Sequence, residues 1–228
     1  MIARKKEFFG GLGLIIVFVI VLIVFFLPLY QGMNGLDYLD NLYNSISKGS
    51  AYYIPKVKEE CEPLRGKGVN VTLRMADDKT AEQTALLFRA ARAEALLSGS
   101  ELKVSGDLGQ ILENSLADAD AMYHNDGERV RGKYGYEERR VIYNWWLAFH
   151  EMDRDLKKQK EFKAAAMVSV VVKKAIESSY NYYQIEPQRI GDKFGTVIFS
   201  LAFYVAYTLW YGFAILFMFE GWGLQLGH

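Results

Sequence analysis

Residues 8–27 read FFGGLGLIIVFVIVLIVFFL, a stretch without a single charged side chain. A second stretch near the other end, residues 194–219, reads FGTVIFSLAFYVAYTLWYGFAILFMF and also lacks charge. Each exceeds the roughly 18 apolar residues that mark a candidate transmembrane helix. The sequence therefore predicts a membrane protein with two transmembrane helices, at residues 8–30 and 194–219, which flank a folded domain at residues 31–193.

The charges beside the first apolar stretch predict how the chain is oriented. Arg4, Lys5 and Lys6 immediately precede it. Because Lys and Arg next to a span mark its cytoplasmic side, residues 1–7 and 220–228 are expected in the cytoplasm and the domain outside it. The expected location is the bacterial inner (cytoplasmic) membrane, crossed twice, with the central domain in the periplasm.

The first span is expected to remain in the mature protein as an anchor. Its apolar region is longer than the about 7–15 residues of a signal peptide, and residues 26–30 offer no small-residue cleavage site. The tail at residues 220–228 is too short for a signalling output module, so any signal would have to pass through another protein.

Composition narrows the expected partners. Without Arg4, Lys5, Lys6, Glu7 and Glu220, residues 31–193 carry 24 Lys and Arg against 25 Asp and Glu, a net charge near −1, so nucleic acid is not an expected partner. The lone Cys61 can form neither an intrachain disulfide nor a cysteine-based zinc site. The lipid bilayer and other membrane-protein subunits are the expected partners.

Between the spans the periodicities predict a mainly helical α+β unit. Alternating apolar and polar residues predict a strand at residues 69–74, and residues 95–97 and 101–104 are predicted to be two short strands joined by a tight turn at Ser98-Gly99-Ser100. Helical spacing predicts helices at residues 36–46, 81–95 and 107–123, and either two helices or one interrupted helix at 136–184.

Local signals predict where the elements begin and end. Thr80 with Gln83 matches a capping box, which predicts that Thr80 is the N-cap of a helix. The glycines of residues 125–135 predict a loop. Glu186 and Pro187 are predicted to begin the helix that enters the membrane, since proline is tolerated in a first helical turn.

The second span differs from the first because it carries polar aromatic side chains. Tyr204, Tyr207 and Tyr211 share one helical face near its expected midpoint, and Ala202 and Ala206 would permit close approach of another helix. Hydrocarbon offers no hydrogen-bond partner for phenol hydroxyls. The interpretation is an intramembrane interface with another subunit.

Three alternatives to that interface stay open. The tyrosines can pack on the protein's own first span, although that span offers no side-chain acceptor. The second helix can also sit deeper than assumed. A lipophilic, quinone-like ligand is a further occupant of the face.

A second aromatic group lies within the predicted domain. Tyr143, Trp145 and Trp146 can form a docking patch or a ligand pocket, or simply pack in the core. A third group, Tyr180, Tyr182 and Tyr183, is predicted to belong to the aromatic belt at the membrane surface.

The sequence contains no recognisable catalytic motif. Asp120 and His124 stand four apart, and His150 is followed by Glu151, but such isolated pairs favour capping or solvated roles over metal binding. No metal and no cofactor are therefore expected, and the protein is not expected to be an enzyme.

The expected function is a non-catalytic accessory or scaffolding subunit of a membrane complex. The alternative is an extracytoplasmic ligand-sensing subunit that signals through a partner. An enzyme that acts on a lipid or envelope substrate is a third and less favoured hypothesis.

Overall fold

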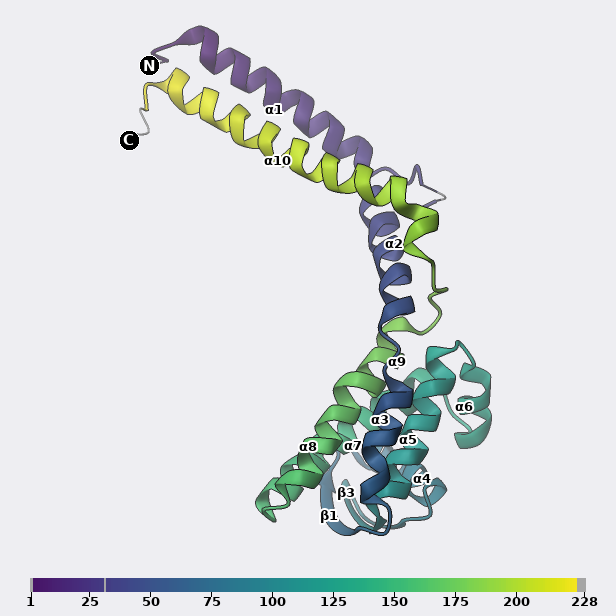
Figure 1. Cartoon of the computed structure of the whole chain (residues 1–228). Helices are drawn as coiled ribbons and strands as arrows, with labels where there is room; N and C mark the ends of the chain where they lie inside the picture. Colours follow the sequence, from purple (N-terminus) through teal and green to yellow (C-terminus); the bar gives the residue numbers. More distant parts are fainter. Residues whose placement is uncertain (1, 31, 225–228) are drawn as a thin grey trace. The chain divides into compact units, whose positions relative to one another are not determined.

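The computed structural model describes residues 2–30 and 32–224 and divides the chain into two compact units. One unit consists of Met1–Gly49 and Pro187–His228, and the other of Ser50–Glu186 (Figure 1). This division groups the helix after the first apolar stretch with the two apolar helices. Each unit is described by itself.

The first unit is built on an antiparallel hairpin of two apolar helices, α1 (Lys5–Phe25) and α10 (Phe194–Trp222) (Figure 1). Both are long and apolar enough to cross a membrane, and most of their side chains face outward. They approach closely at Gly11 and Gly221. A β-carbon at Gly11 would collide with the backbone of Ala214, and one at Gly221 with the backbone of Phe8.

A third helix, α2 (Gly35–Ser50), packs on the part of α10 that continues past the end of α1. The hydroxyls of Tyr43 and Ser200 are 2.5 Å apart, and the N–H of Gln188 donates to the carbonyl of Ser45 at 3.0 Å. The prediction that a helix begins at Glu186 and Pro187 is wrong. Because the Gln188 N–H bonds to α2 and not within a helical turn, the chain stays non-helical until the 3₁₀ turn η3 (Ile190–Lys193).

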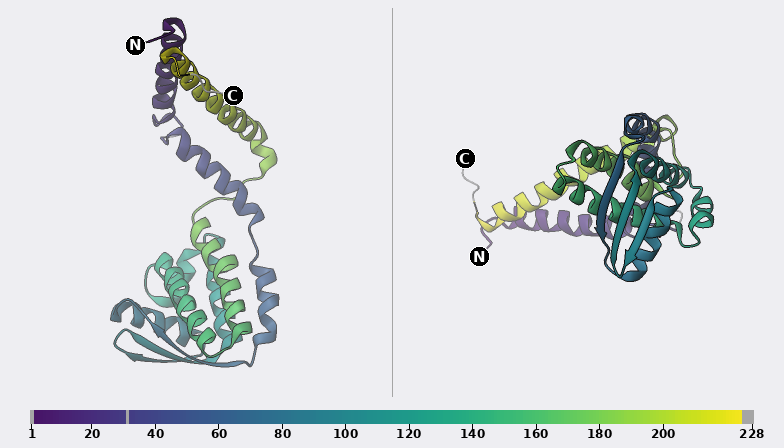
Figure 2. Two further views of the ribbon diagram at one scale, coloured as in Figure 1. Left: turned by 90° about the vertical axis from the view of Figure 1, so that its left-hand side faces the viewer. Right: turned by 90° about the horizontal axis from the view of Figure 1, so that it is seen from below.

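The second unit contains a three-stranded antiparallel sheet of β1 (Gly68–Arg74), β2 (Glu94–Ser98) and β3 (Glu101–Asp107), in the order β1-β3-β2. The predicted strands and the β2–β3 hairpin are confirmed. Val71 lies opposite Val104 and Leu73 opposite Leu102, all buried on one face. The helices cover that face only, and the other face stays open (Figure 2).

The predicted mainly helical character of this unit is confirmed. Its helices are α3 (Ile54–Cys61), η1 (Glu62–Leu64), α4 (Asp78–Ala90), α5 (Leu108–Tyr123), α6 (Gly127–Tyr134), α7 (Glu138–Lys158), α8 (Phe162–Val171), the π-helical turn η2 (Val172–Ile176) and α9 (Glu177–Tyr182). The chain turns between α7 and α8 at Lys160, whose φ is 63°. The predicted helical region therefore consists of two helices, the second of which contains the π-turn.

Two local predictions are corrected. The N-cap of α4 is Asp77, whose carboxylate accepts from the Thr80 N–H at 2.6 Å, so Thr80 lies inside the helix. An aspartate three residues ahead offers the same capping bond as the predicted box and takes precedence. The predicted loop at residues 125–135 contains α6, which ends at the left-handed Gly135.

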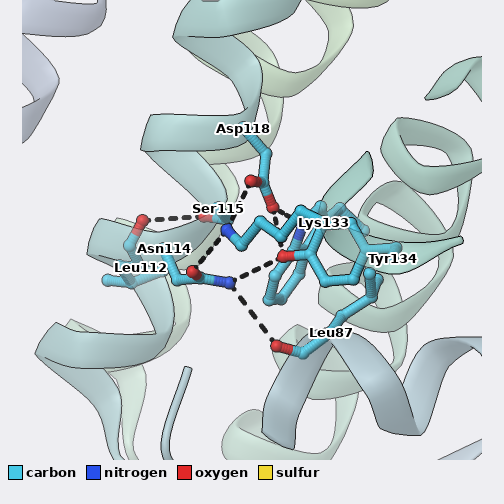
Figure 3. A network of polar contacts seen from close by, with 8 residues as sticks. Leu87, Leu112, Asn114, Ser115, Asp118, Lys133 and Tyr134 are labelled. Carbon is cyan, nitrogen blue, oxygen red and sulfur yellow. Dashed lines mark hydrogen bonds and ion pairs between the residues drawn. The ribbon is translucent and has the colours of Figure 1, made fainter. Parts of the chain in front are cut away.

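A buried carboxylate joins α5, α6 and α7 (Figure 3). Asp118 is 3% exposed and accepts from Lys133 Nζ at 2.6 Å, from the Tyr134 hydroxyl at 2.6 Å and from Trp145 Nε1 at 2.9 Å. Asn114 accepts from the same ammonium and donates to the same hydroxyl. Burial, together with the Asp118 charge, raises the pKa of Tyr134, so the hydroxyl remains a donor.

Asp118→Ala should lower the free energy of unfolding by about 2–4 kcal/mol, because it leaves two buried donors, the Tyr134 hydroxyl and the Trp145 indole, without their acceptor. Denaturant unfolding of the full chain in detergent, followed by tryptophan fluorescence, measures the loss. Arg154→Ala is the control: the Arg154 side chain that pairs with Glu151 is 66% exposed, and its removal should cost less than about 1 kcal/mol. Equal effects of the two substitutions would contradict the role given to Asp118.

Candidate functional site

A groove lies on the Ser50–Glu186 unit between α7 and α9. Its volume is about 320 Å³ and its floor, Ile142 with Ile176, is fully buried. Tyr143 and Tyr180, which line it, are 40% and 38% exposed. We call it the aromatic groove, formed by Ile142, Tyr143, Trp146, Ile176, Glu177, Tyr180 and Asn181.

Polar and ring contacts hold the Trp146 indole in place. Its Nε1 donates to Glu177 Oε1 at 3.0 Å, which ties α7 to α9. The Tyr143 ring stacks on it with an interplanar angle of 12° and a centroid distance of 5.9 Å. The centroid of the His150 ring lies 4.0 Å from that of the indole. The indole is therefore ordered before any ligand or partner arrives.

Two guanidinium groups lie over rings of the groove. Arg139 is 5.8 Å from the centroid of Tyr180 and 5.3 Å from that of Tyr183. Arg140 is 5.3 Å from the centroid of Tyr143 and donates to the Thr80 hydroxyl at 2.8 Å. Such cation–π contacts limit the motion of the rings and place positive charge beside the groove.

The π-turn η2 ends at the groove. It adds a residue to the helical repeat just before Glu177, so it changes the direction in which Glu177 and Tyr180 point relative to α8. Single π-turns inside longer helices are frequent at functional sites.

A second buried carboxylate fixes the end of α9 next to the groove. Glu138 accepts from the Tyr183 hydroxyl at 2.8 Å and from Arg131 Nε at 2.9 Å. Burial alone would raise the pKa of Glu138, but hydrogen bonds from its own backbone, Tyr183 and Arg131 outweigh burial and lower it. Gly127 faces the Tyr183 hydroxyl, where a β-carbon would not fit.

The prediction that residues 180, 182 and 183 form a membrane-surface belt is wrong for Tyr183, which is buried within the domain. Tyr182 packs edge-on against Tyr123, with centroids 5.9 Å apart, and Tyr180 lines the groove. Contacts with α5 and α7, which are distant in sequence, place these rings.

The structure separates the three aromatic residues predicted as a docking or ligand patch. Tyr143 and Trp146 lie in the groove, whereas Trp145 is fully buried and belongs to the core. Sequence reasoning missed Glu177, Tyr180 and Arg139. The available signal was the spacing 139, 143, 146 and 150, which marks one face of a helix distinct from the buried face of Trp145.

The tyrosines of the hairpin occupy different environments. Tyr207 stacks on Phe18 of α1, with centroids 4.4 Å apart, and Tyr211 lies 5.2 Å from the same ring. Tyr204 is 67% exposed. Among residues 2–30 and 32–224, none of the three hydroxyls has a hydrogen-bond partner, and neither has the buried Nε1 of Trp210.

The hairpin also sets the level of each side chain along α10. The ring of Phe25, the last residue of α1, stacks on the ring of Phe203 with their centroids 6.0 Å apart. Tyr204 is therefore level with the end of α1 and not with its middle. Ala202 and Ala206 are exposed, so their small side chains do not serve contact with α1.

The histidine–carboxylate pair on α5 is part of a hydrogen-bonded cluster. Asp120 Oδ1 lies 3.3 Å from His124 Nδ1 and accepts from the Tyr52 hydroxyl at 2.5 Å. Burial and the Asp120 carboxylate raise the pKa of Tyr52 to about 12. In the part of the chain that the structure describes, no group of three His, Cys, Asp or Glu side chains could hold a metal ion.

The aromatic groove thus combines π faces, one carboxylate and two neighbouring guanidiniums, a set suited to recognising a ligand or a partner. Comparison of the chain with protein-family models, curated proteins and solved structures gives no match.

The lowered pKa of Glu138 predicts a pH-dependent contribution to stability. Because the folded pKa is below the ordinary 4.5, the contribution is present above that pH and is lost as the pH falls through the folded value. Glu138→Gln should therefore destabilise the protein by about 2 kcal/mol at pH 7, with a difference that shrinks on acidification. Denaturant unfolding at a series of pH values measures it.

The matched control for this measurement is Glu128→Gln, since the Glu128 side chain is 92% exposed. It should leave stability unchanged at every pH. A wild-type advantage over Glu138→Gln that grows as the pH falls would contradict the assignment.

Proposed function

We propose that this protein is a non-catalytic accessory or scaffolding subunit of a membrane protein complex. In this proposal α1 and α10 cross the bacterial inner membrane, both termini are cytoplasmic and the Ser50–Glu186 unit is periplasmic. Partners dock on the periplasmic unit and on α10.

The hydroxyls of Tyr204, Tyr207 and Tyr211, which have no partner among the described residues, are the observation that carries the proposal. Tyr207 and Tyr211 lie beside Phe18, within the length of α1, and a hydroxyl kept from any hydrogen bond in an apolar medium costs on the order of 1–3 kcal/mol by protein mutational estimates. The apolar side chains of α1 cannot accept these bonds. A neighbouring helix with polar side chains could, and the exposed Ala202 and Ala206 would let it approach closely.

A quinone-like ligand is the other occupant that could accept these bonds. An apolar hollow of about 260 Å³ in the hairpin unit is lined in part by Phe25, Phe203, Tyr204 and Tyr207. A carbonyl of such a ligand could accept from Tyr204. We favour a protein partner because Tyr211 does not line this hollow.

Ligand sensing is the alternative function, and the ends of the periplasmic unit favour it. Tyr52 bonds to Asp120 near the end of α5, while Asn125, just beyond α5, donates to the carbonyl of Ile185 and accepts from the Gln184 N–H. Tyr52 and Ile185 lie near the two ends of this unit, where the chain continues to α2 and towards α10. Movement of α5 would therefore be passed to both of these chain segments. The aromatic groove, at about 320 Å³, is at the small end of the range for ligand pockets.

The triple variant Tyr204→Phe, Tyr207→Phe, Tyr211→Phe keeps the rings and removes the hydroxyls. It should still insert, while partner recovery falls at least about tenfold, because 1.4 kcal/mol of binding free energy corresponds to a factor of ten. Quantitative mass spectrometry of chains that co-purify from mildly solubilised native membranes measures recovery.

Val17→Leu with Ile20→Leu is the control for this experiment, because both residues are exposed on α1 and apolar. Recovery should not change. If no chain co-purifies stoichiometrically with the wild type, the scaffolding function is refuted. Loss of a bound quinone, with partners retained, would assign the tyrosines to the ligand.

The proposed topology predicts opposite labelling of two cysteines. Gly132→Cys places a thiol on exposed α6 where a β-carbon meets open space, and Leu224→Cys places one near the C-terminus. In spheroplasts a membrane-impermeant maleimide should label the first and reach the second only after permeabilisation. The native Cys61 is buried and gives little background. The reverse pattern would overturn the orientation.

A further inference from the structure

We propose that the aromatic groove is the docking site for an acidic segment of a partner protein, in which an Asp or Glu lies next to a bulky apolar side chain. This inference rests on the proposed scaffolding function and specifies the chemistry of the partner.

Charge at the groove favours an acidic segment. In the described ranges 2–30 and 32–224, neither Arg139 nor Arg140 forms an ion pair with a carboxylate. Each lies over a ring that lines the groove. Two guanidiniums against the single carboxylate of Glu177 leave a positive excess, and Glu177 already accepts from the Trp146 indole.

The other carboxylates of this helical turn are engaged elsewhere. Glu138 accepts from Arg131 and from the Tyr183 hydroxyl. Glu137 accepts from the backbone N–H groups of Arg139 and Arg140 and so caps α7. Neither is within ion-pair distance of the two guanidiniums, and a carboxylate from outside would meet unsatisfied donors.

The shape of the groove favours an apolar side chain beside that carboxylate. The floor, Ile142 with Ile176, is fully buried, and the walls are aromatic. Tyr, Trp and Arg are the residue types that dominate protein–protein hot spots. Because Trp146 is already held by Glu177, binding would order few additional side chains.

The spacing of the two guanidiniums favours an extended segment over a compact anion. Arg139 and Arg140 are consecutive on α7, and consecutive helical residues do not face each other. They therefore cannot converge on one phosphate-sized group. A peptide that carries its carboxylate and its apolar side chain at separate positions can meet one guanidinium and the apolar floor at once.

The test uses the full-length protein in its native membranes, with the photo-crosslinking residue p-benzoylphenylalanine in place of Tyr143. Mass spectrometry of the crosslinked peptide gives its sequence. We expect a protein segment with Asp or Glu close to the crosslinked residue, beside an aromatic or aliphatic side chain. The crosslink should fall at least fivefold in the same protein with Arg139→Glu added.

Two controls keep the result interpretable. The crosslinking residue in place of Leu96, which is exposed on the sheet, should not capture the same segment. Arg139→Gln, with the melting temperature of each variant measured by circular dichroism, separates loss of charge from loss of folding; it should also weaken the crosslink, and by less than Arg139→Glu.

Several outcomes would overturn the inference. They are capture of a basic segment, capture of lipid only, or an unchanged yield in Arg139→Glu. If stoichiometric partners co-purify but Tyr143 captures none of them, the groove assignment fails and the scaffolding function stands. If nothing co-purifies at all, the scaffolding function itself fails.

Discussion

The buried side chain of Trp145, whose indole donates to the buried Asp118 carboxylate, lies on the inward face of α7 and helps to fix which face looks outward. Neighbouring residues of a helix point in different directions, so fixing Trp145 in the core leaves Tyr143 and Trp146 on the surface. Lys133 and Tyr134 also donate to this carboxylate. The position of the aromatic groove thus depends on this buried polar contact together with the apolar side chains buried on the same face of α7, among them Ala148, Phe149 and Met152.

Three polar contacts then hold α7 against the helix formed by α8, η2 and α9. Ser169 donates to Asp153 at one end, Trp146 to Glu177 in the middle and Tyr183 to Glu138 at the other end. Between the last two, the rings of Tyr143 and Tyr180 stay partly exposed. Exposed aromatic side chains on an otherwise well-packed domain are what a binding surface requires, and here the scaffold that holds them is rigid.

A different constraint governs the hairpin unit: among the described residues, no hydrogen-bond acceptor faces the tyrosine hydroxyls of α10. Small residues let α1 and α10 approach, and Phe18 packs against the rings of Tyr207 and Tyr211. Those contacts pack the rings but do not satisfy their hydroxyls, because residues 8–25 of α1 carry only apolar side chains. The unsatisfied donors are the reason to propose a partner for α10.

The sequence alone determined what depends on local patterns. The lengths of the two charge-free stretches predicted the two apolar helices. Alternation predicted the first strand, a tight turn between two short apolar segments predicted the hairpin, and Asp107 marked the start of α5. The tertiary structure decided which aromatic residues share a surface: it buried Trp145 and Tyr183 and brought Tyr180 beside Tyr143. It also set Tyr204 level with the end of α1. These outcomes depend on contacts between residues far apart in the chain, and helical spacing shows which side chains share a face but not what that face packs against.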